Sequence, residues 1–243
     1  MKLTIVLAIT LTLSTTSARS LLNLKDLKDF LRNPYQYAIP VSPTAPYSTP
    51  SSTIHSSLTL SSIIPEVLDD FSPSYALSII YPETHSSVEL GNDIPVPEVK
   101  EPPVFEIHSI DADGFGENKK KKNATFTLIL TDPDAKSRSN PKWSEMCHWI
   151  VTRVTVDDTI SPIRILANDE LISYLPPGPP PKTGRHRYVF VLLKGEEGQE
   201  LSKPKERQHW GYGKVRHGVR DWAGEMDLEV VGANWFYALN KKQ

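Results

Sequence analysis

The chain has 243 residues, of which 39% are hydrophobic and 23% charged, and its formal net charge is −2 at pH 7. This length fits one domain with extensions, and the nearly balanced charge gives no reason to expect nucleic acid as a partner. The single cysteine, Cys147, excludes an internal disulfide and a metal site built from several cysteines.

The N-terminus has the pattern of a cleaved secretory signal peptide. Lys2 precedes the apolar run Leu3–Leu13, and small residues follow through Ser20. The apolar run is too short for a comfortable membrane span. We therefore predict a signal peptide over residues 1–20, secretion and no transmembrane segment. A buried N-terminal helix or an uncleaved anchor is the alternative.

An N-terminal extension and linker are expected over residues 21–57. Leu21–Arg32 has the pattern of a short amphipathic helix, ended by Asn33 and Pro34. Pro40–Ser57 is rich in Pro, Ser and Thr and has few apolar residues to bury, which is typical of a linker. The globular domain is expected to start near Leu58 and to occupy residues 58–243.

Short runs rich in β-branched and aromatic residues predict strands. These runs are Ser74–Ile80, Val104–His108, Thr125–Leu130, Trp149–Val154, Tyr188–Leu193 and Asn234–Leu239. Helical patterns lie near the two ends of the domain, at Leu58–Ile64, which Pro65 stops, and at Gly218–Glu225. This segregation favours a β-rich domain with peripheral helices over a repeated βαβ fold.

The basic run Asn118–Asn123 is expected to be a solvated hairpin tip, with contact to anionic lipid headgroups as the alternative. Asn123 also begins the sequence Asn-Ala-Thr, which makes it a candidate glycosylation site.

Two polar blocks interrupt the predicted strands. Asp132 and Asp134 follow the apolar run Phe126–Leu130, and after a polar loop His148 opens the next apolar run. In the second block, Gly178–Phe190, a Pro/Gly loop leads to a histidine, an arginine and a tyrosine at the start of a strand. Imidazole, hydroxyl and backbone N–H groups are good donors to an anion. The sequence therefore suggests one anion-binding pocket built from two loops.

The two blocks resemble the motifs of the phosphatidylethanolamine-binding protein family. The first motif, Asp-Pro-Asp-x-Pro and a later His, stands here as Asp132–Lys136 followed by His148, with Lys136 in place of the closing proline. The second, Gly-x-His-Arg, stands as Gly184–Arg187. The resemblance covers roughly Leu58 to Leu239. It implies a mostly β fold, an antiparallel β-sandwich with short peripheral and C-terminal helices.

The resemblance also implies which residues surround the pocket for a phosphate or acetate-like group. They match Asp132, His148, Gly178, Pro179, His186 and Tyr188 here, and Trp143 matches an aromatic residue at the mouth. Asp132 is expected to hold a histidine in one tautomer. Asp134 belongs to the predicted set. Arg187 should point to the other face of its strand and pair with Asp134.

An enzyme is not expected, because the sequence has no Gly-x-Ser-x-Gly elbow, no phosphate-cradling Gly-Lys-Ser/Thr loop and no His-Glu-x-x-His. Neighbours on a strand point to opposite faces, so Cys147 is expected to be buried and not paired with His148. A zinc site from Asp132, His148 and His186 is conceivable on ligand type, but the resemblance implies an anion there. No cofactor is expected.

We therefore predict a secreted, monomeric, non-enzymatic protein that binds a phospholipid headgroup or another small anion. The alternative partner is a protease, since Ser61–Ser74 and Val88–Asn92 resemble the fungal branch of the family, which contains inhibitors of the carboxypeptidase Y type. That resemblance implies inhibition through an acetylated N-terminus, which removal of a signal peptide would prevent. A hydrolase ranks last.

Overall fold

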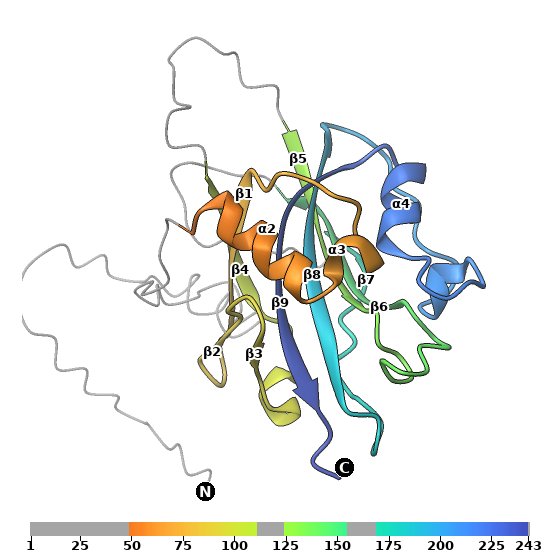
Figure 1. Ribbon diagram of the computed structural model, residues 1–243. Coiled ribbons are helices and arrows are strands. Elements are labelled where there is room, and N and C mark those ends of the chain that lie inside the picture. Colours follow the sequence, from red (N-terminus) through yellow and green to blue (C-terminus); the bar gives the residue numbers. More distant parts are fainter. Residues whose placement is uncertain (1–48, 111–123, 155–168, 243) are drawn as a thin grey trace, which may run out of the picture. The chain divides into compact units, whose positions relative to one another are not determined.

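Two β-sheets form the centre of the molecule (Figure 1). The computed structural model describes residues 49–110, 124–154 and 169–242, which all belong to one compact unit, Ala38–Gln243. The smaller sheet has the strand order β2-β1-β4 and the larger one the order β3-β9-β8-β5-β6-β7. Neighbouring strands are antiparallel, except that β3 runs parallel to β9.

The strands of the smaller sheet are β1 (Tyr75–Tyr81), β2 (Ser86–Ser87) and β4 (Val104–Ser109). Those of the larger sheet are β3 (Asn92–Asp93), β5 (Ala124–Asp132), β6 (Met146–Val154), β7 (Glu170–Ile172), β8 (Arg185–Glu196) and β9 (Glu229–Leu239). The helices are α2 (Ser51–Leu60), α3 (Ile63–Glu66) and α4 (Val219–Glu225), with short 3₁₀ turns η2 (Val96–Val99) and η4 (His209–Gly211).

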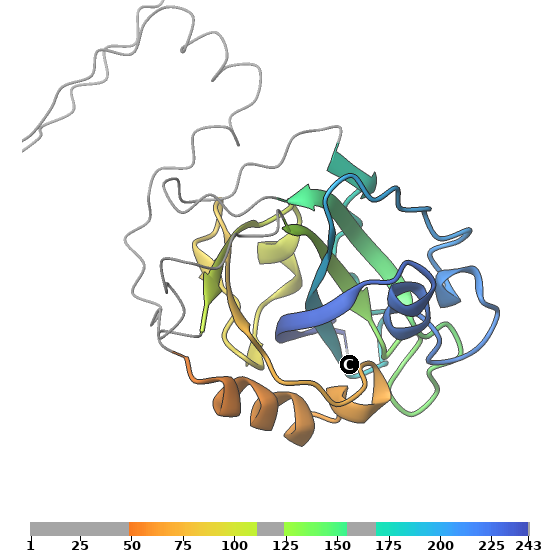
Figure 2. The ribbon, with the colours of Figure 1, turned by 90° about the horizontal axis from the view of Figure 1, so that it is seen from above.

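Strand β8 lies at the centre because both of its faces are buried from His186 through Leu193 and are apolar from Tyr188 onward. Phe190 belongs to the core between the two sheets, together with Phe105 of β4. Val191 faces the other way and packs in a second core with Trp222 of α4. Figure 2 shows the smaller sheet on one side of the larger sheet and α4 on the other. The mostly β, sandwich-type fold expected from the sequence is confirmed.

A single side chain on β9 links the two sheets. Asn234 Nδ2 donates to the carbonyls of Leu77 and Val88, each at 2.9 Å. Its Oδ1 accepts the backbone N–H of Leu90 at 3.0 Å. The buried amide thus satisfies three backbone groups that the edge of the smaller sheet and the following loop would otherwise leave unpaired.

The six predicted strands correspond to β1, β4, β5, β6, β8 and β9, with ends shifted by up to five residues. Helix α4 matches the predicted C-terminal helix. The short strands β2, β3 and β7 were not predicted.

The predicted C-terminal boundary of the linker, Ser57, is wrong, because Ser51–Ser57 belong to α2. Ile54 and Leu58 are four residues apart, lie on one face of the helix and are both buried. The helix predicted over Leu58–Ile64 has other bounds, because α2 ends at Leu60. The short helix α3 has a kink at Ile64, whose extended dihedrals (φ −94°, ψ 122°) are usual before proline.

Several sequence predictions fall outside the described residues: the signal peptide, most of the extension, the basic run Asn118–Asn123 and the glycosylation site at Asn123. Within the residues that the structure does describe, no helix has the length and apolar character needed to cross a bilayer.

Candidate functional site

The two polar blocks meet at one end of the six-stranded sheet. Asp132 is the last residue of β5, His148 lies near the start of β6, and His186 and Tyr188 lie near the start of β8. Because β5 pairs with both β6 and β8, these strand ends are neighbours. The structure thus brings together four residues of the predicted pocket: Asp132, His148, His186 and Tyr188.

Asp132 is the centre of the cluster. One of its carboxylate oxygens accepts a hydrogen bond from His186 Nδ1 at 2.9 Å, and the other accepts the backbone N–H of Asp134 at 2.7 Å. The side chains of His186 and Asp132 are only 1% and 5% exposed. A buried, charge-assisted hydrogen bond of this kind fixes both the carboxylate and the imidazole ring.

The second nitrogen of His186 also has a partner. Nε2 lies 2.9 Å from the hydroxyl oxygen of Thr183, and that hydroxyl lies 2.7 Å from the carbonyl oxygen of Pro180. The single hydroxyl proton is donated to the carbonyl, so the Thr183 oxygen is the acceptor for His186. Both ring nitrogens of His186 therefore lie within hydrogen-bond distance of oxygen atoms.

His148 is held differently. Its Nδ1 donates to the carbonyl of Leu175 at 2.7 Å, while Nε2 has no hydrogen-bond partner among the described residues. Burial lowers the pKa of His148, and the opposing charge of Asp132 does not outweigh it. The ring is therefore neutral near pH 7, with its proton on Nδ1 and a lone pair on Nε2.

Tyr188 packs between the two histidines. Its ring stands edge-on to His148, with 5.3 Å between centroids, and stacks on His186 at 6.4 Å. The hydroxyl oxygen of Tyr188 accepts the N–H of Gly178 at 3.2 Å. Burial, with the charge of Asp132, raises the pKa of Tyr188 well above its ordinary value. The phenol is therefore neutral and can act as a donor.

A residue after β9, Asn240, holds the Pro/Gly loop in place. Pro179 is buried, and its carbonyl accepts a hydrogen bond from Asn240 Nδ2 at 3.1 Å. Two of the predicted donors, the N–H of Gly178 and Nε2 of His186, are thus hydrogen-bonded to protein atoms.

Arg187 points to the opposite side of β8 and braces the first loop, as predicted. Its backbone N–H and Nε each donate to one oxygen of Asp134 at 2.9 Å, and Nη2 donates to the other at 2.7 Å. Both side chains are 1% exposed. Burial alone would lower the pKa of Arg187, but Asp134 and then Glu66 raise it. Asp134 therefore holds the loop, and its two oxygens are fully engaged.

Trp143 lies on the outer part of the first loop. Its backbone N–H donates to the Ala135 carbonyl at 2.9 Å, and the ammonium groups of Lys136 and Lys142 lie 5.8 and 5.1 Å from its ring centre. No ring contact joins Trp143 to the buried histidines within the described part of the chain. It is a rim residue in this structure.

Sequence reasoning missed three groups that hold the histidines: Thr183, the carbonyl of Leu175 and Arg207. Arg207 donates to the His148 carbonyl at 3.1 Å, and its charge helps to lower the pKa of that ring. Of the three, Thr183 could have been found from the sequence, because it lies three residues before His186 in the same block.

Sequence reasoning also missed a buried carboxyl group, Glu145. One oxygen lies 3.2 Å from the Thr131 hydroxyl and 3.4 Å from the backbone N–H of Val219, while the other has no partner among the described residues. Burial raises the pKa of Glu145 to about 8. This carboxyl lies under α4 and belongs to the scaffold around the pocket.

Cys147 is completely buried, as predicted, and burial raises the pKa of its thiol to about 12. A thiol with that pKa is not a nucleophile near pH 7. Among the described residues, no group of three His, Cys, Asp or Glu side chains is arranged to hold a metal ion.

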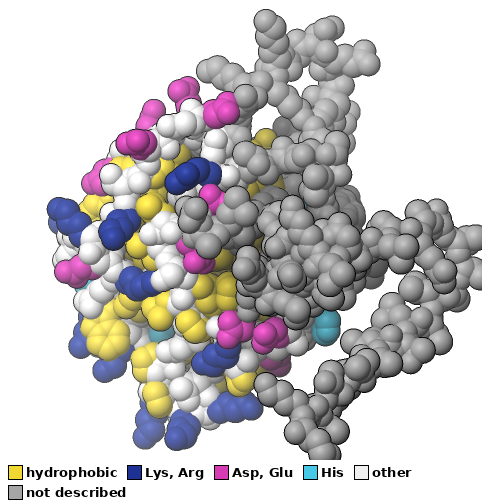
Figure 3. Space-filling view, turned by 180° about the vertical axis from the view of Figure 1, so that it is seen from behind, with side chains coloured by type: hydrophobic (Ala, Val, Ile, Leu, Met, Phe, Trp, Pro, Cys, Tyr) yellow, Lys and Arg dark blue, Asp and Glu magenta, His cyan; other side chains and the backbone are white. Residues whose placement is uncertain are grey.

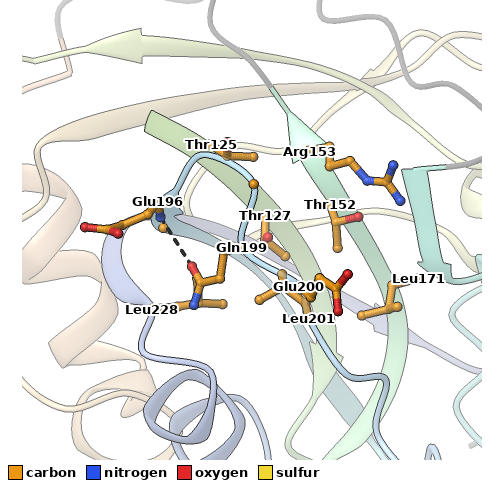
Figure 4. Close-up of a pocket in the computed structure, with 12 residues that line it drawn as sticks. Thr125, Thr127, Thr152, Arg153, Leu171, Glu196, Gln199, Glu200, Leu201 and Leu228 are labelled. Carbon is orange, nitrogen blue, oxygen red and sulfur yellow. Dashed lines mark hydrogen bonds between the residues drawn. The ribbon is translucent and has the colours of Figure 1, made fainter. Parts of the chain in front are cut away.

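A cavity of about 490 Å³ lies at the other end of β5 (Figure 4). Its wall includes Thr125, Thr127 and Thr152 from the sheet, and the loop after β8 closes it. Gln199 of that loop accepts the N–H of Glu196 at 3.3 Å. The cavity includes none of the predicted site residues. This cavity and the cluster of hydrogen-bonding groups therefore lie at different ends of the sheet, and the buried histidines carry the stronger chemical argument.

Comparisons with known proteins point to one family. The family model described as phosphatidylethanolamine-binding protein matches residues 84–236. The chain is 34% identical over 209 residues to carboxypeptidase Y inhibitor of Saccharomyces cerevisiae, covering 74% of this chain and 91% of that relative. It is 31% identical over 189 residues to Protein FLOWERING LOCUS T of Arabidopsis thaliana, covering 77% of this chain and 92% of that one.

Comparisons with solved structures point to the same family. A crystal structure of carboxypeptidase Y inhibitor complexed with its cognate proteinase matches with a TM-score of 0.68 and 32% identity, over 79% of this chain and 97% of that one. The phosphatidylethanolamine-binding protein from Plasmodium vivax matches with a TM-score of 0.62, over 76% of this chain and 97% of that one. Its identity of 19% supports the fold alone.

Proposed function

Because the chain belongs to the phosphatidylethanolamine-binding protein family, we propose that it is a non-enzymatic binding protein for a phosphate-type anion, such as a phospholipid headgroup. The proposal depends mainly on one observation: two buried histidines pack against the same tyrosine at one end of the sheet. Their donors lie in a buried environment, where charge-assisted hydrogen bonds are strong.

The proposed anion takes over donors that are now engaged with protein atoms. It replaces the Thr183 oxygen at His186 Nε2 and the Tyr188 oxygen at the Gly178 N–H. At His148 the lone pair on Nε2 repels an anion. This ring therefore binds the anion only after it has taken a proton, either from the solution or from the ligand itself. Binding is therefore coupled to the protonation of His148.

The test is calorimetry with inorganic phosphate between about pH 5 and about pH 8, the range in which histidine titrates. We expect His186→Ala and His148→Ala each to weaken binding by about 1.5–3 kcal/mol, the usual scale for a hydrogen bond to a charged group. The double variant should lose less than the sum, because both rings contact one ligand. His55→Ala, on α2, is the matched control.

The pH dependence has a definite sign. Burial lowers the pKa of His148 in the free protein, and a bound anion favours the protonated ring. Affinity should therefore rise as the pH falls through the histidine range. Unchanged affinity in both site variants, or binding that strengthens as the pH rises, would refute the anion site.

A second candidate function is protease inhibition. It is favoured by the 34% identity to carboxypeptidase Y inhibitor and by the similarity to the structure of that inhibitor with its proteinase. The test is an inhibition assay with carboxypeptidase Y, using the chain from Met1 and the chain from Leu21. Inhibition by the first chain alone would assign the activity to the N-terminus.

We also propose that the protein is secreted, on the strength of Lys2 and the apolar run Leu3–Leu13. N-terminal sequencing of the exported protein should then find a first residue between Arg19 and Leu21. An intact Met1 would contradict secretion by signal cleavage and would favour the inhibitor function.

A further inference from the structure

The loops that build the proposed anion pocket also carry an exposed group of lysines. Five of them, here termed the lysine rim, are Lys136, Lys142, Lys182, Lys241 and Lys242. They lie in the segments 133–144, 173–184 and 240–242. In these segments the only acidic residue is Asp134, which is buried and paired with Arg187. The whole chain has a net charge of −2, so this concentration of positive charge is local.

The rim is one surface because the three segments are tied together. The N–H of Lys182 donates to the carbonyl of Lys242 at 3.0 Å, and Asn240 donates to Pro179. The His186–Asp132 pair joins the ends of β8 and β5, which adjoin the second and the first segment. In Figure 3, dark blue side chains gather along the lower edge of the molecule, the end at which β9 finishes in Figure 1.

Apolar side chains are interspersed with the lysines. Trp143 is partly exposed between Lys136 and Lys142. The same three segments and the adjoining end of β9 carry Leu175 and Leu239, two of the four exposed large hydrophobic side chains of the described residues. They are 37% and 36% exposed. Lysine ammonium groups interspersed with tryptophan and leucine are typical of surfaces that lie on a bilayer.

We propose that the lysine rim docks on the surface of an anionic phospholipid bilayer, with the pocket facing the lipid headgroups. The orientation of the pocket rests on the proposed function, whereas docking depends on the rim alone. The partner is inferred from charge complementarity, because a positively charged rim attracts an anionic surface. The rim lysines lie on the loops next to the site residues and do not form the stripe along a helix or groove that is typical of nucleic acid binding. An acidic protein is the competing partner, and the test includes it.

The test is co-sedimentation with vesicles of phosphatidylcholine, with and without phosphatidylserine. We expect binding only to the vesicles that contain phosphatidylserine, and weaker binding as salt is raised. One lysine near an anionic surface strengthens binding roughly fivefold. Reversing three charges, in Lys136→Glu/Lys142→Glu/Lys182→Glu, should therefore lower the partition coefficient more than about a hundredfold.

The matched control is Lys203→Glu/Lys205→Glu/Lys214→Glu, which changes the net charge equally at exposed lysines outside the rim. It should keep most of the binding. Equal loss in both triple variants would mean that only net charge matters, and full binding by the rim variant would also overturn the proposal. Tighter binding to polyglutamate than to the vesicles would reassign the rim to an acidic protein.

His186→Ala separates this inference from the proposed function. The variant should lose phosphate binding and still sediment with phosphatidylserine vesicles. If the unaltered protein binds no phosphate but docks on vesicles through the rim, the proposed function fails and the docking surface remains.

Discussion

Two carboxylates of one loop, two residues apart, have separate tasks. Asp132 faces the pocket and orients His186, while Asp134 faces away and binds Arg187. The division follows from strand alternation on β8, which places His186 and Arg187 on opposite faces. Each acidic side chain is thus matched to one basic side chain, and the buried charges are compensated in pairs.

The Arg187–Asp134 pair should be essential to stability. Arg187→Met leaves Asp134 buried without its partner, which typically costs about 3–5 kcal/mol. Urea unfolding measures the loss. The control is Arg185→Met on the same strand, which breaks an exposed ion pair with Asp93 and should cost at most about 1 kcal/mol. Similar losses in the two variants would contradict a special role for Arg187.

Glu145 should make the protein less stable at alkaline pH. Its pKa is raised to about 8 in the folded state, so the folded protein binds more protons than the unfolded chain between pH 4.5 and about pH 8. The stability from this group is complete below that interval and is lost as the pH rises through about 8. Glu145→Gln should therefore gain roughly 1–4 kcal/mol over the unaltered protein at about pH 9 and little at about pH 5.

Urea unfolding at the two pH values checks this, with the exposed Glu197→Gln as the control. The same pH dependence in Glu145→Gln as in the unaltered protein would show that another group controls the alkaline loss of stability.

At the scale of elements, helix α2 shows how tertiary packing can outweigh composition. Its sequence, SSTIHSSLTL, is mostly Ser and Thr, which are poor helix formers. Only Ile54 and Leu58 are buried, and Leu60 is 87% exposed. The helix is therefore stabilised mainly by burying two side chains against the sheet.

Ile54→Ala should accordingly destabilise the domain by about 2–5 kcal/mol, the usual cost of truncating a buried isoleucine. Leu60→Ala on the same helix should change the free energy of unfolding by less than about 0.5 kcal/mol. Thermal or urea unfolding of the two variants provides the measurement. No effect of Ile54→Ala would mean that α2 does not contribute to the stability of the domain.

At the scale of the whole molecule, the sequence predicted the strands that have long apolar runs and missed those without a pattern. Strand β8 was predicted because it is apolar on both faces, whereas β3 and β7 have two and three residues, too few for a period. Asp132 and His186 could be placed together from their motifs although they are 54 residues apart.

Glu145 could not be predicted as buried, because its burial depends on a distant backbone. A side chain at Gly218 would approach Glu145 Cδ to 2.7 Å, so that glycine lets the chain pass directly over the carboxyl group. Contacts of this kind depend on how loops cross in three dimensions, and no local pattern in the sequence encodes them.

The position of β9 has a consequence for how the protein is made. This last strand lies between β3 and β8, and Asn234 on it binds carbonyls 146 and 157 residues earlier in the chain. Strand β9 leaves the ribosome after the other strands of its sheet, so the edge of β8 stays open until β9 has emerged. Such distant pairings fold slowly, and an open strand edge invites association with other chains. The nascent chain is therefore most prone to aggregate in the interval before β9 emerges, and a chain truncated before Glu229 would remain in that state.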